Sequence, residues 1–186
     1  MSLILLSPPA SEPVTLAELK QHLRVTHTDE DALITGVLVA AVRAVEARGG
    51  LACMPQQWRL TLDAPPMETL HLPIAPVASI DAITVTDGEG APQPVDASVY
   101  EFASGSPGRL RPAGPWPQPA PKIDGVRIDF TAGYADAGAV PEPLKQAVKI
   151  LAGYFYETRE AAHETRVYTV PQSVDALLAP YREFRL

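Results

Sequence analysis

Two helical patterns occupy the first 50 residues. The first begins at Thr15, a good N-cap, and Glu18 three residues later completes a capping box. Its apolar positions recur at helical spacing: Leu16, Leu19 and Leu23. The second begins at Thr28 or Asp29 and ends at Gly49-Gly50, because glycine readily adopts a left-handed C-cap. The pattern predicts two neighbouring helices, the second with a wide apolar face: Leu33, Ile34, Val37, Leu38, Ala41 and Val45.

Alternating apolar and polar residues predict short strands in the middle of the chain. Residues 57–63 alternate Trp58, Leu60 and Leu62 with polar side chains, which is typical of a half-buried strand. Residues 80–86 have the same period and run into Asp87-Gly88-Glu89-Gly90, a strong hairpin signal. Further strands are expected at 99–102 and 125–130. This order favours a small, mostly antiparallel sheet.

The last part of the chain returns to helical spacing. Pro141 and Pro143 suit a first helical turn, and an apolar stripe follows: Leu144, Ala147, Val148, Leu151 and Phe155. After a polar link, the tail at 171–186 has more apolar groups than it can bury on itself, with arginines between them: Val174, Leu177, Leu178, Tyr181, Arg182, Phe184 and Arg185. The tail either docks on its own domain or fills a groove in a partner, where aromatic and arginine residues are frequent.

The 20 prolines are distributed unevenly and divide the chain. None lies between Val14 and Met54, whereas many lie between Pro55 and Pro121. Because proline lacks a backbone donor and fixes φ, it is excluded from helix interiors and central strands. The chain therefore has a helical front, a loop- and strand-rich middle and a helical back.

Charge and cysteine content narrow the possible partners. The chain has 22 acidic and 15 basic residues, a net charge of −7, which argues against an electrostatic grip on nucleic-acid phosphates. The acidic excess lies mainly in residues 53–140, with ten acidic and five basic residues. Cys53 alone cannot form an internal disulfide or a cysteine-based zinc site, and we expect it to be a small buried hydrophobe. No basic segment precedes the short apolar start, and no apolar stretch reaches the ~18 residues of a membrane span, so neither a signal peptide nor a membrane contact is expected.

No residue spacing predicts catalysis or metal binding. There is no G-x-S-x-G nucleophile elbow, and the four histidines lack a metal-binding spacing: His22, His27, His71 and His163. Asp29-Glu30-Asp31 is explained by the charged first turn of a helix, since it lacks the glycine and final glutamate of a calcium loop. We therefore expect no enzyme activity, no cofactor and no metal. A small β-rich binding module or enzyme is the alternative from a different class, although an aromatic content of 6% offers few exposed binding aromatics.

Several segments in order along the chain carry a family resemblance. They are PVTLAELK at 13–20 with HLRV at 22–25, DEDALI at 29–34, QWRLTLD at 57–63, FTAGY at 130–134 with Val140-Pro141, YETR at 156–159 and VDALLAPYR at 174–182. On these residues the chain resembles head–tail connector, or adaptor, proteins of long-tailed phages, prophages and phage-derived gene-transfer particles.

The resemblance implies an α+β fold that agrees with the proline distribution. It implies a helical bundle with a β-rich, proline-rich insertion between the second and third main helices, and a C-terminal anchoring tail. The expected parts are the N-terminal helical part at 1–54, the β-rich insertion at 55–139, the third main helix at 140–165 and the C-terminal tail at 166–186.

The resemblance also implies a structural role without chemistry. Copies of the chain would form a ring beneath the portal, matching its twelvefold symmetry, join the capsid to the tail or neck, and let DNA pass through the lumen without specific binding. The expected partners are the portal protein, copies of itself and the next neck protein, a stopper or tail terminator. The expected location is the virion neck, after synthesis in the bacterial cytoplasm.

The tail is the candidate portal-binding segment. In such connectors the C-terminal segment commonly attaches to the portal, so the resemblance implies this role for the seven tail residues from Val174 to Arg185 named above. A head-closure or tail-terminator protein of the same neck is the alternative within this class.

Overall fold

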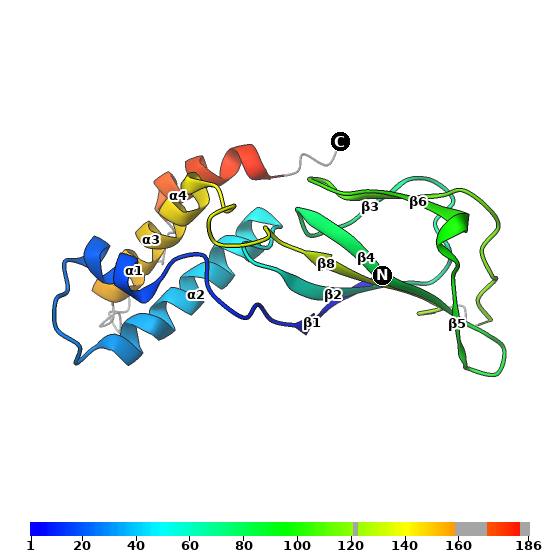
Figure 1. Cartoon of the computed structure of the whole chain (residues 1–186), viewed down its shortest axis with the longest axis horizontal. Helices are drawn as coiled ribbons and strands as arrows, with labels where there is room; N and C mark the ends of the chain where they lie inside the picture. The colour runs from blue at the N-terminus through cyan, green and yellow to red at the C-terminus, as the bar shows by residue number, and fades with distance from the viewer. Residues whose placement is uncertain (121–122, 159–170, 183–186) are drawn as a thin grey trace, which may run out of the picture. The chain divides into compact units, whose positions relative to one another are not determined.

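The structure is a computed structural model that describes residues 1–120, 123–158 and 171–182. The chain divides into two compact units, each built from two separate stretches of sequence. The β unit joins Met1–Ala10 to Pro55–Tyr134, and the helical unit joins Ser11–Met54 to Ala135–Leu186. The molecule is therefore a mixed α+β protein, with its helices and its antiparallel sheets in different units (Figure 1).

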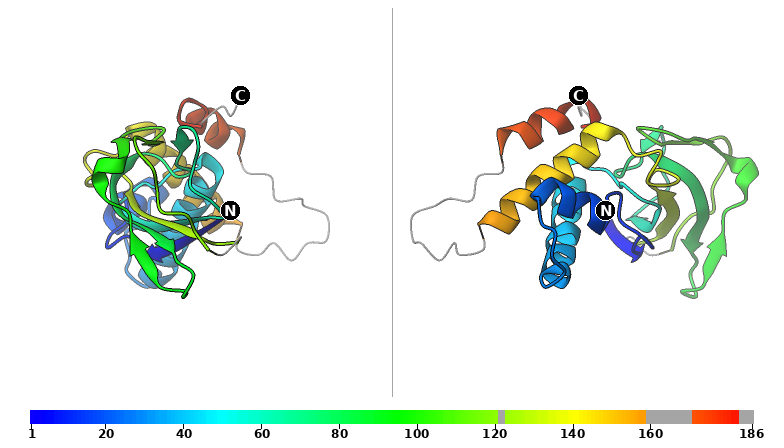
Figure 2. Two further views of the ribbon diagram at one scale, coloured as in Figure 1. Left: turned by 90° about the vertical axis from the view of Figure 1, so that its right-hand side faces the viewer. Right: turned by 60° about the vertical axis from the view of Figure 1, so that its left-hand side comes forward.

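Four α-helices form the described part of the helical unit. They are α1 (Leu16–Leu23), α2 (Asp31–Gly49), α3 (Glu142–Glu157) and α4 (Gln172–Leu178), and the 3-10 turn η2 (Ala179–Tyr181) follows α4. The helix α3 packs against α1, α2 and α4. Figure 2 shows α4 running back along α3 in the opposite direction. The core between the helices is aliphatic: Leu19, Ile34, Leu38, Val42, Val45, Leu144, Val148, Leu151, Val174 and Leu178.

Helix ends follow the sequence signals at α1 and depart from them at the start of α2. The Thr15 hydroxyl accepts a hydrogen bond from the Glu18 backbone N–H (3.2 Å), and the Thr15 N–H donates to the Glu18 carboxylate (2.7 Å), which confirms the predicted capping box. The helix α2 begins at Asp31 instead of near Thr28, because the Asp31 N–H closes a turn onto the Thr28 carbonyl (3.1 Å). Its other end is as predicted, with Gly50 as a left-handed C-cap (φ 64°).

Two antiparallel sheets build the β unit. The larger has the strand order β1 (Ser2–Ser7), β2 (Gln56–Leu62), β8 (Val126–Ala132), β4 (Val77–Thr86) and β5 (Pro92–Pro94). The smaller has the order β3 (Leu70–His71), β7 (Arg109–Pro112) and β6 (Tyr100–Ala103), and the short 3-10 helix η1 (Ala97–Val99) precedes β6. The predicted hairpin is confirmed, because β4 and β5 pair in antiparallel fashion across the turn at 87–91.

The central strand β8 carries the core of the larger sheet. Val126, Ile128 and Phe130 alternate with more exposed side chains and are completely buried, as the period of the sequence predicts. Ile128 lies opposite Leu60 of β2 and Ile83 of β4, so three strands supply one apolar layer.

Close packing also ties the smaller sheet to the larger. Val77 exchanges backbone hydrogen bonds with Gly105 (2.8 and 2.9 Å). A Cβ added at Gly108 would lie 2.3 Å from a Val77 methyl, so only glycine fits there. In the proline-dense connection after β7, Trp116 is buried, packs edge-on against Tyr100 and donates to the Val99 carbonyl (3.0 Å).

The N-terminus differs from the expected helical part at 1–54. Residues Ser2–Ser7 form β1 and pair with β2, and the first ten residues belong to the β unit. The reason is local: a run of four apolar residues is compatible with a strand, and Pro8-Pro9 ends it before the helical segment starts. Within the described ranges, no helix has the length and apolar character needed to span a membrane.

Candidate partner-binding surfaces

The helix α4 of the tail is docked on its own helical unit. Val174 and Leu178 lie one turn apart and are completely buried. The Leu178 side chain lies beside α2 at Gly49, where an added Cβ would come to 3.9 Å from a leucine methyl. These two residues are therefore explained by packing within the chain. They are covered for as long as α4 stays docked.

The Asp175 carboxylate, on the partly exposed side of α4, accepts hydrogen bonds from two arginines and so holds the helix to α2. Arg48 of α2 donates to both oxygens of Asp175, from Nε (2.6 Å) and from Nη2 (2.8 Å), and Arg182 donates to Oδ1 (2.6 Å). Hydrogen bonds from Arg48, and next from Arg182, hold the pKa of Asp175 well below its usual range. The Asp175 side chain keeps about a third of its surface in water, so solvent screening limits what the charges contribute. The parallel fork geometry fixes how α4 sits on α2.

The remaining predicted tail residues divide between partly exposed and undescribed positions. Leu177, Tyr181 and Arg182 keep part of their surface accessible after α4 docks. Phe184 and Arg185 lie outside the described residues. The structure thus brings five of the seven predicted residues together on α4 and the turn after it, and three of these five offer surface to a partner.

A charged cluster, buried at Glu46 and partly exposed at Arg43 and Glu12, links the end of α2 to the segments before and after the helix. Glu46 is 7% exposed and accepts hydrogen bonds from the Cys53 backbone N–H (2.8 Å) and from Arg43 (2.6 Å). Arg43 also donates to Glu12 (3.2 Å). Burial raises the pKa of Glu12; Arg43 opposes this rise and Glu46 adds to it. The cluster stabilises the fold and offers no free group for catalysis, because Arg43 pairs with both carboxylates and Glu46 also accepts from the Cys53 backbone.

The Cys53 thiol is not set up for nucleophilic chemistry. It is completely buried, and burial, with a further contribution from the Glu46 carboxylate, raises its pKa to about 12. Since the thiolate is the reactive form, this thiol is inert at neutral pH. In the described part of the chain, no group of three histidine, cysteine or acidic residues is placed to hold a metal ion. His163 lies outside that part.

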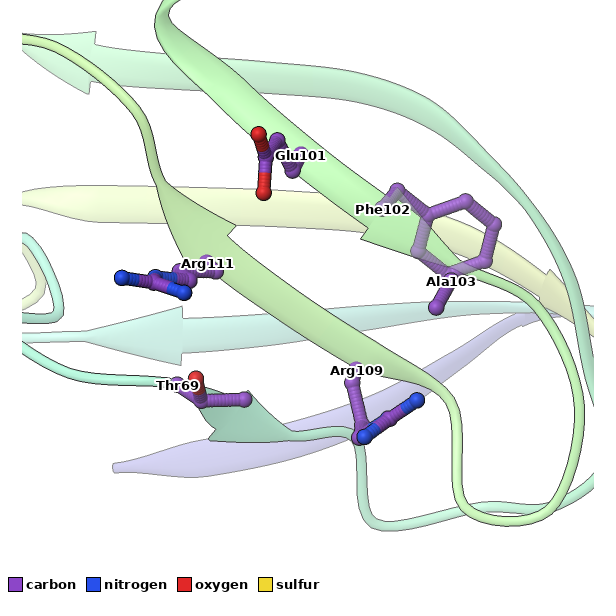
Figure 3. Close-up of a pocket in the computed structure, with 6 residues that line it drawn as sticks. All are labelled: Thr69, Glu101, Phe102, Ala103, Arg109 and Arg111. Atoms are coloured by element: carbon purple, nitrogen blue, oxygen red, sulfur yellow. The ribbon is translucent and has the colours of Figure 1, made fainter.

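One shallow cavity of about 310 Å³ lies on the smaller sheet (Figure 3). It is lined by Thr69, Glu101, Phe102, Ala103, Arg109 and Arg111. Glu101 of β6 lies directly opposite Arg111 of β7, an opposite-charge pair of positions across the strands. The lining combines charges of both signs with one aromatic ring and has no histidine, cysteine or serine. It suits contact with another protein surface better than chemistry on a small molecule.

The sequence patterns missed the strand β1. Its four apolar residues fail the requirements for a signal peptide, and their alternation is too short to stand out as a strand pattern. The signal that identifies them is the combination of a short apolar run with the terminating Pro8-Pro9, which is typical of a strand. The structure places this run at the edge of the larger sheet.

Comparisons with known proteins give matches over almost the whole chain. The family model described as "Head completion protein" matches residues 12–184. A search of curated proteins gave no match.

Solved structures of gene transfer agent (GTA) particles contain similar chains. A chain in the virion of a native GTA particle is 33% identical with a TM-score of 0.82, and one in the neck of an empty particle, computed with C6 symmetry, is 32% identical with the same TM-score. A chain in the neck of a native particle, computed with C12 symmetry, is 30% identical with a TM-score of 0.81. Each match covers 100% of this chain and 97% of the other chain.

Proposed function

Because the chain belongs to the head completion protein family, we propose that it is a ring-forming connector in the neck of a phage-derived particle. In this role it joins the capsid portal to the next neck protein and surrounds the path of the DNA. The family consists of structural proteins of virus particles, so the chain is not an enzyme.

The observation that carries the proposal is the end-to-end match with chains of GTA necks. Both units are included, since the match covers 100% of this chain at 30–33% identity. The C12 symmetry applied to one of these necks supports a ring of copies of this chain. A cyclic ring requires each copy to present two different surfaces to its two neighbours.

We assign portal attachment to the tail. Leu177, Tyr181 and Arg182 keep accessible surface on a segment that Asp175 and two buried side chains hold in place. The sequence continues from there through Phe184 and Arg185, so aromatic and arginine groups are concentrated at this end of the chain. Such groups commonly dominate the binding energy of an interface.

The acidic balance of the chain fits a pore that passes DNA without holding it. Its net charge of −7 opposes DNA phosphates over a Debye length of about 8–10 Å. A ring of copies multiplies this charge around the path of the DNA.

Native mass measurement of the chain with and without a portal ring from the same particle tests the proposal. Addition of twelve copies to a bare twelvefold portal ring is the expected result. Addition only after another neck protein already covers the portal would overturn the adaptor role in favour of head closure. A chain that adds to neither assembly would overturn the neck role itself.

The tail is tested by point variants, because deleting 171–186 would also remove Val174 and Leu178 from the core. We expect Tyr181→Ala combined with Phe184→Ala to weaken portal binding at least tenfold, equivalent to about 1.4 kcal/mol. The matched control is Met67→Ala, at a side chain that is 97% exposed in the β unit. Portal affinity of the double variant equal to that of the control would place the attachment elsewhere.

A further inference from the structure

The strand β1 exposes apolar side chains on both of its faces. Leu3, Ile4, Leu5 and Leu6 are 36%, 52%, 39% and 43% exposed, and alternate residues of a strand point to opposite faces. Strands that are apolar on both faces normally lie inside a sheet that is covered on both sides. β1 instead lies at an edge, and β2 is its one partner among the described strands.

The other edge of the same sheet is protected. There β5 begins with Pro92 and ends with Pro94, and neither residue has a backbone N–H to offer to an added strand. Proteins commonly block open sheet edges with proline or charge. The strand β1 has neither in its sequence SLILLS, and its pairing with β2 is regular from Ser2 to Leu5, before a register shift between Leu5 and Ser7. One edge of the sheet is thus closed to added strands, while the other combines an open edge with apolar surface.

We propose that β1 is part of the seam between neighbouring copies of this chain in the ring. The inference rests on the proposed ring, which brings copies side by side around an axis. A cyclic interface joins two different surfaces, so β1 of one copy contacts a surface other than β1 on its neighbour. The absence of charge along β1 fits an identical neighbour held in permanent contact, because the buried centres of interfaces are depleted in charge.

The first test introduces a charge on β1 without disturbing the monomer. Ile4→Glu changes a side chain that is more than half exposed, and Met67→Glu is the matched control, an apolar-to-acidic change in the same unit. We expect Ile4→Glu to keep the melting temperature and circular dichroism of the monomer. We also expect it to bind portal rings as incomplete sets of copies, with at least tenfold more chain needed for full occupancy. Full occupancy of the portal at the wild-type concentration would overturn the inference.

This outcome is separable from failure of the proposed function. If the wild-type chain binds no portal, the connector role fails whatever β1 does. If the wild type completes rings and Ile4→Glu completes them equally well, the connector role stands and the seam is wrong.

A photo-crosslinking amino acid in place of Ile4 identifies what covers β1 in the assembled neck. The expected product is a covalent dimer of this chain, with the second attachment site outside β1. A product with the portal or the next neck protein would overturn the inference, as would a product that joins β1 to β1, since that arrangement makes a twofold pair.

Discussion

At the scale of single residues, Glu46 shows how a buried charge is accommodated in the helical unit. Its carboxylate accepts from the Cys53 backbone and from Arg43, so the cost of burial is offset by two charge-assisted hydrogen bonds. The same carboxylate acts on the neighbouring thiol, because a negative charge disfavours a second one nearby. Burial is the main reason that Cys53 stays in its protonated form, and the Glu46 charge adds to it. The sequence predicts a small buried hydrophobe at this position, and the structure confirms it.

We expect Cys53 to react with a disulfide reagent at pH 8 at least a hundredfold more slowly in the native protein than in urea. Its thiol has a pKa of about 12 and no exposed surface, so reaction requires unfolding. The control is Leu33→Cys in a Cys53→Ser background, since Leu33 is 41% exposed on α2 and the new thiol should react readily. Absorbance of the released thiolate gives both rates. Fast labelling of native Cys53 would contradict the buried position.

At the scale of elements, the starts of α1 and α2 show which sequence signals for a helix N-terminus are reliable. Thr15 and Glu18 satisfy each other reciprocally, and two matching residue types three apart are a specific signal. Thr28 is an equally good cap by residue type but lies in the turn before α2, where Glu30 is the N-cap and its side chain makes no capping bond. A single polar residue before a helix therefore does not determine the residue at which the helix begins.

The contrast between these threonines gives a stability prediction. Thr15→Ala should lower the free energy of unfolding by about 0.5–2 kcal/mol, the usual cost of losing a capping hydroxyl. Thr28→Ala should change it by less than about 0.5 kcal/mol, as is usual for a surface substitution away from a cap. Urea denaturation of both variants at pH 7 measures the two values. Equal losses would mean that the Thr15 hydroxyl does not cap α1.

Helices and strands whose pattern lies in their own residues could be predicted from the sequence. The pairing and packing of elements that are distant in the sequence could not. The period of Val126, Ile128 and Phe130 identified β8 and its buried face, yet nothing local indicated that β2 and β4 flank it. At β1 the short apolar run is compatible with a strand, but nothing local indicates that it pairs with β2, about fifty residues later. The residue pattern of the tail is compatible with both docking and partner binding, because the choice depends on how Val174 packs against residues distant in the sequence.

At the scale of the whole molecule, carboxylates in both units make the free energy of unfolding depend on pH. Hydrogen bonds lower the pKa values of four of them: Glu18, Asp87, Asp96 and Asp175. These groups stabilise the fold above the ordinary carboxyl range, and the contribution is lost as the pH falls through their folded-state pKa values. Glu12 acts in the opposite direction: its raised pKa favours the fold at low pH, and this contribution is lost as the pH rises.

Because four carboxylates have lowered pKa values and only Glu12 has a raised one, we expect the protein to be less stable in urea at pH 3 than at pH 7. Asp175→Asn should lower the stability at pH 7 and reduce its loss on going to pH 3, because the variant cannot be protonated at this position. The matched control is Asp29→Asn, the same chemical change at a side chain that is 89% exposed. Denaturation midpoints measured from pH 3 to pH 7 provide the comparison. An unchanged slope for Asp175→Asn would show that its arginine pairs contribute nothing to folding.

The arginine-held carboxylate on α4 also has a mechanical consequence. A helix of seven residues is too short to persist alone, so any tension applied at the tail is carried by its attachments. The two hydrogen bonds from Arg48 to Asp175 transmit part of that force to α2, which with 19 residues is the longest described helix. If the tail attaches the chain to the portal as proposed, tension on it is resisted jointly by the Arg48–Asp175 hydrogen bonds and by the buried side chains of Val174 and Leu178.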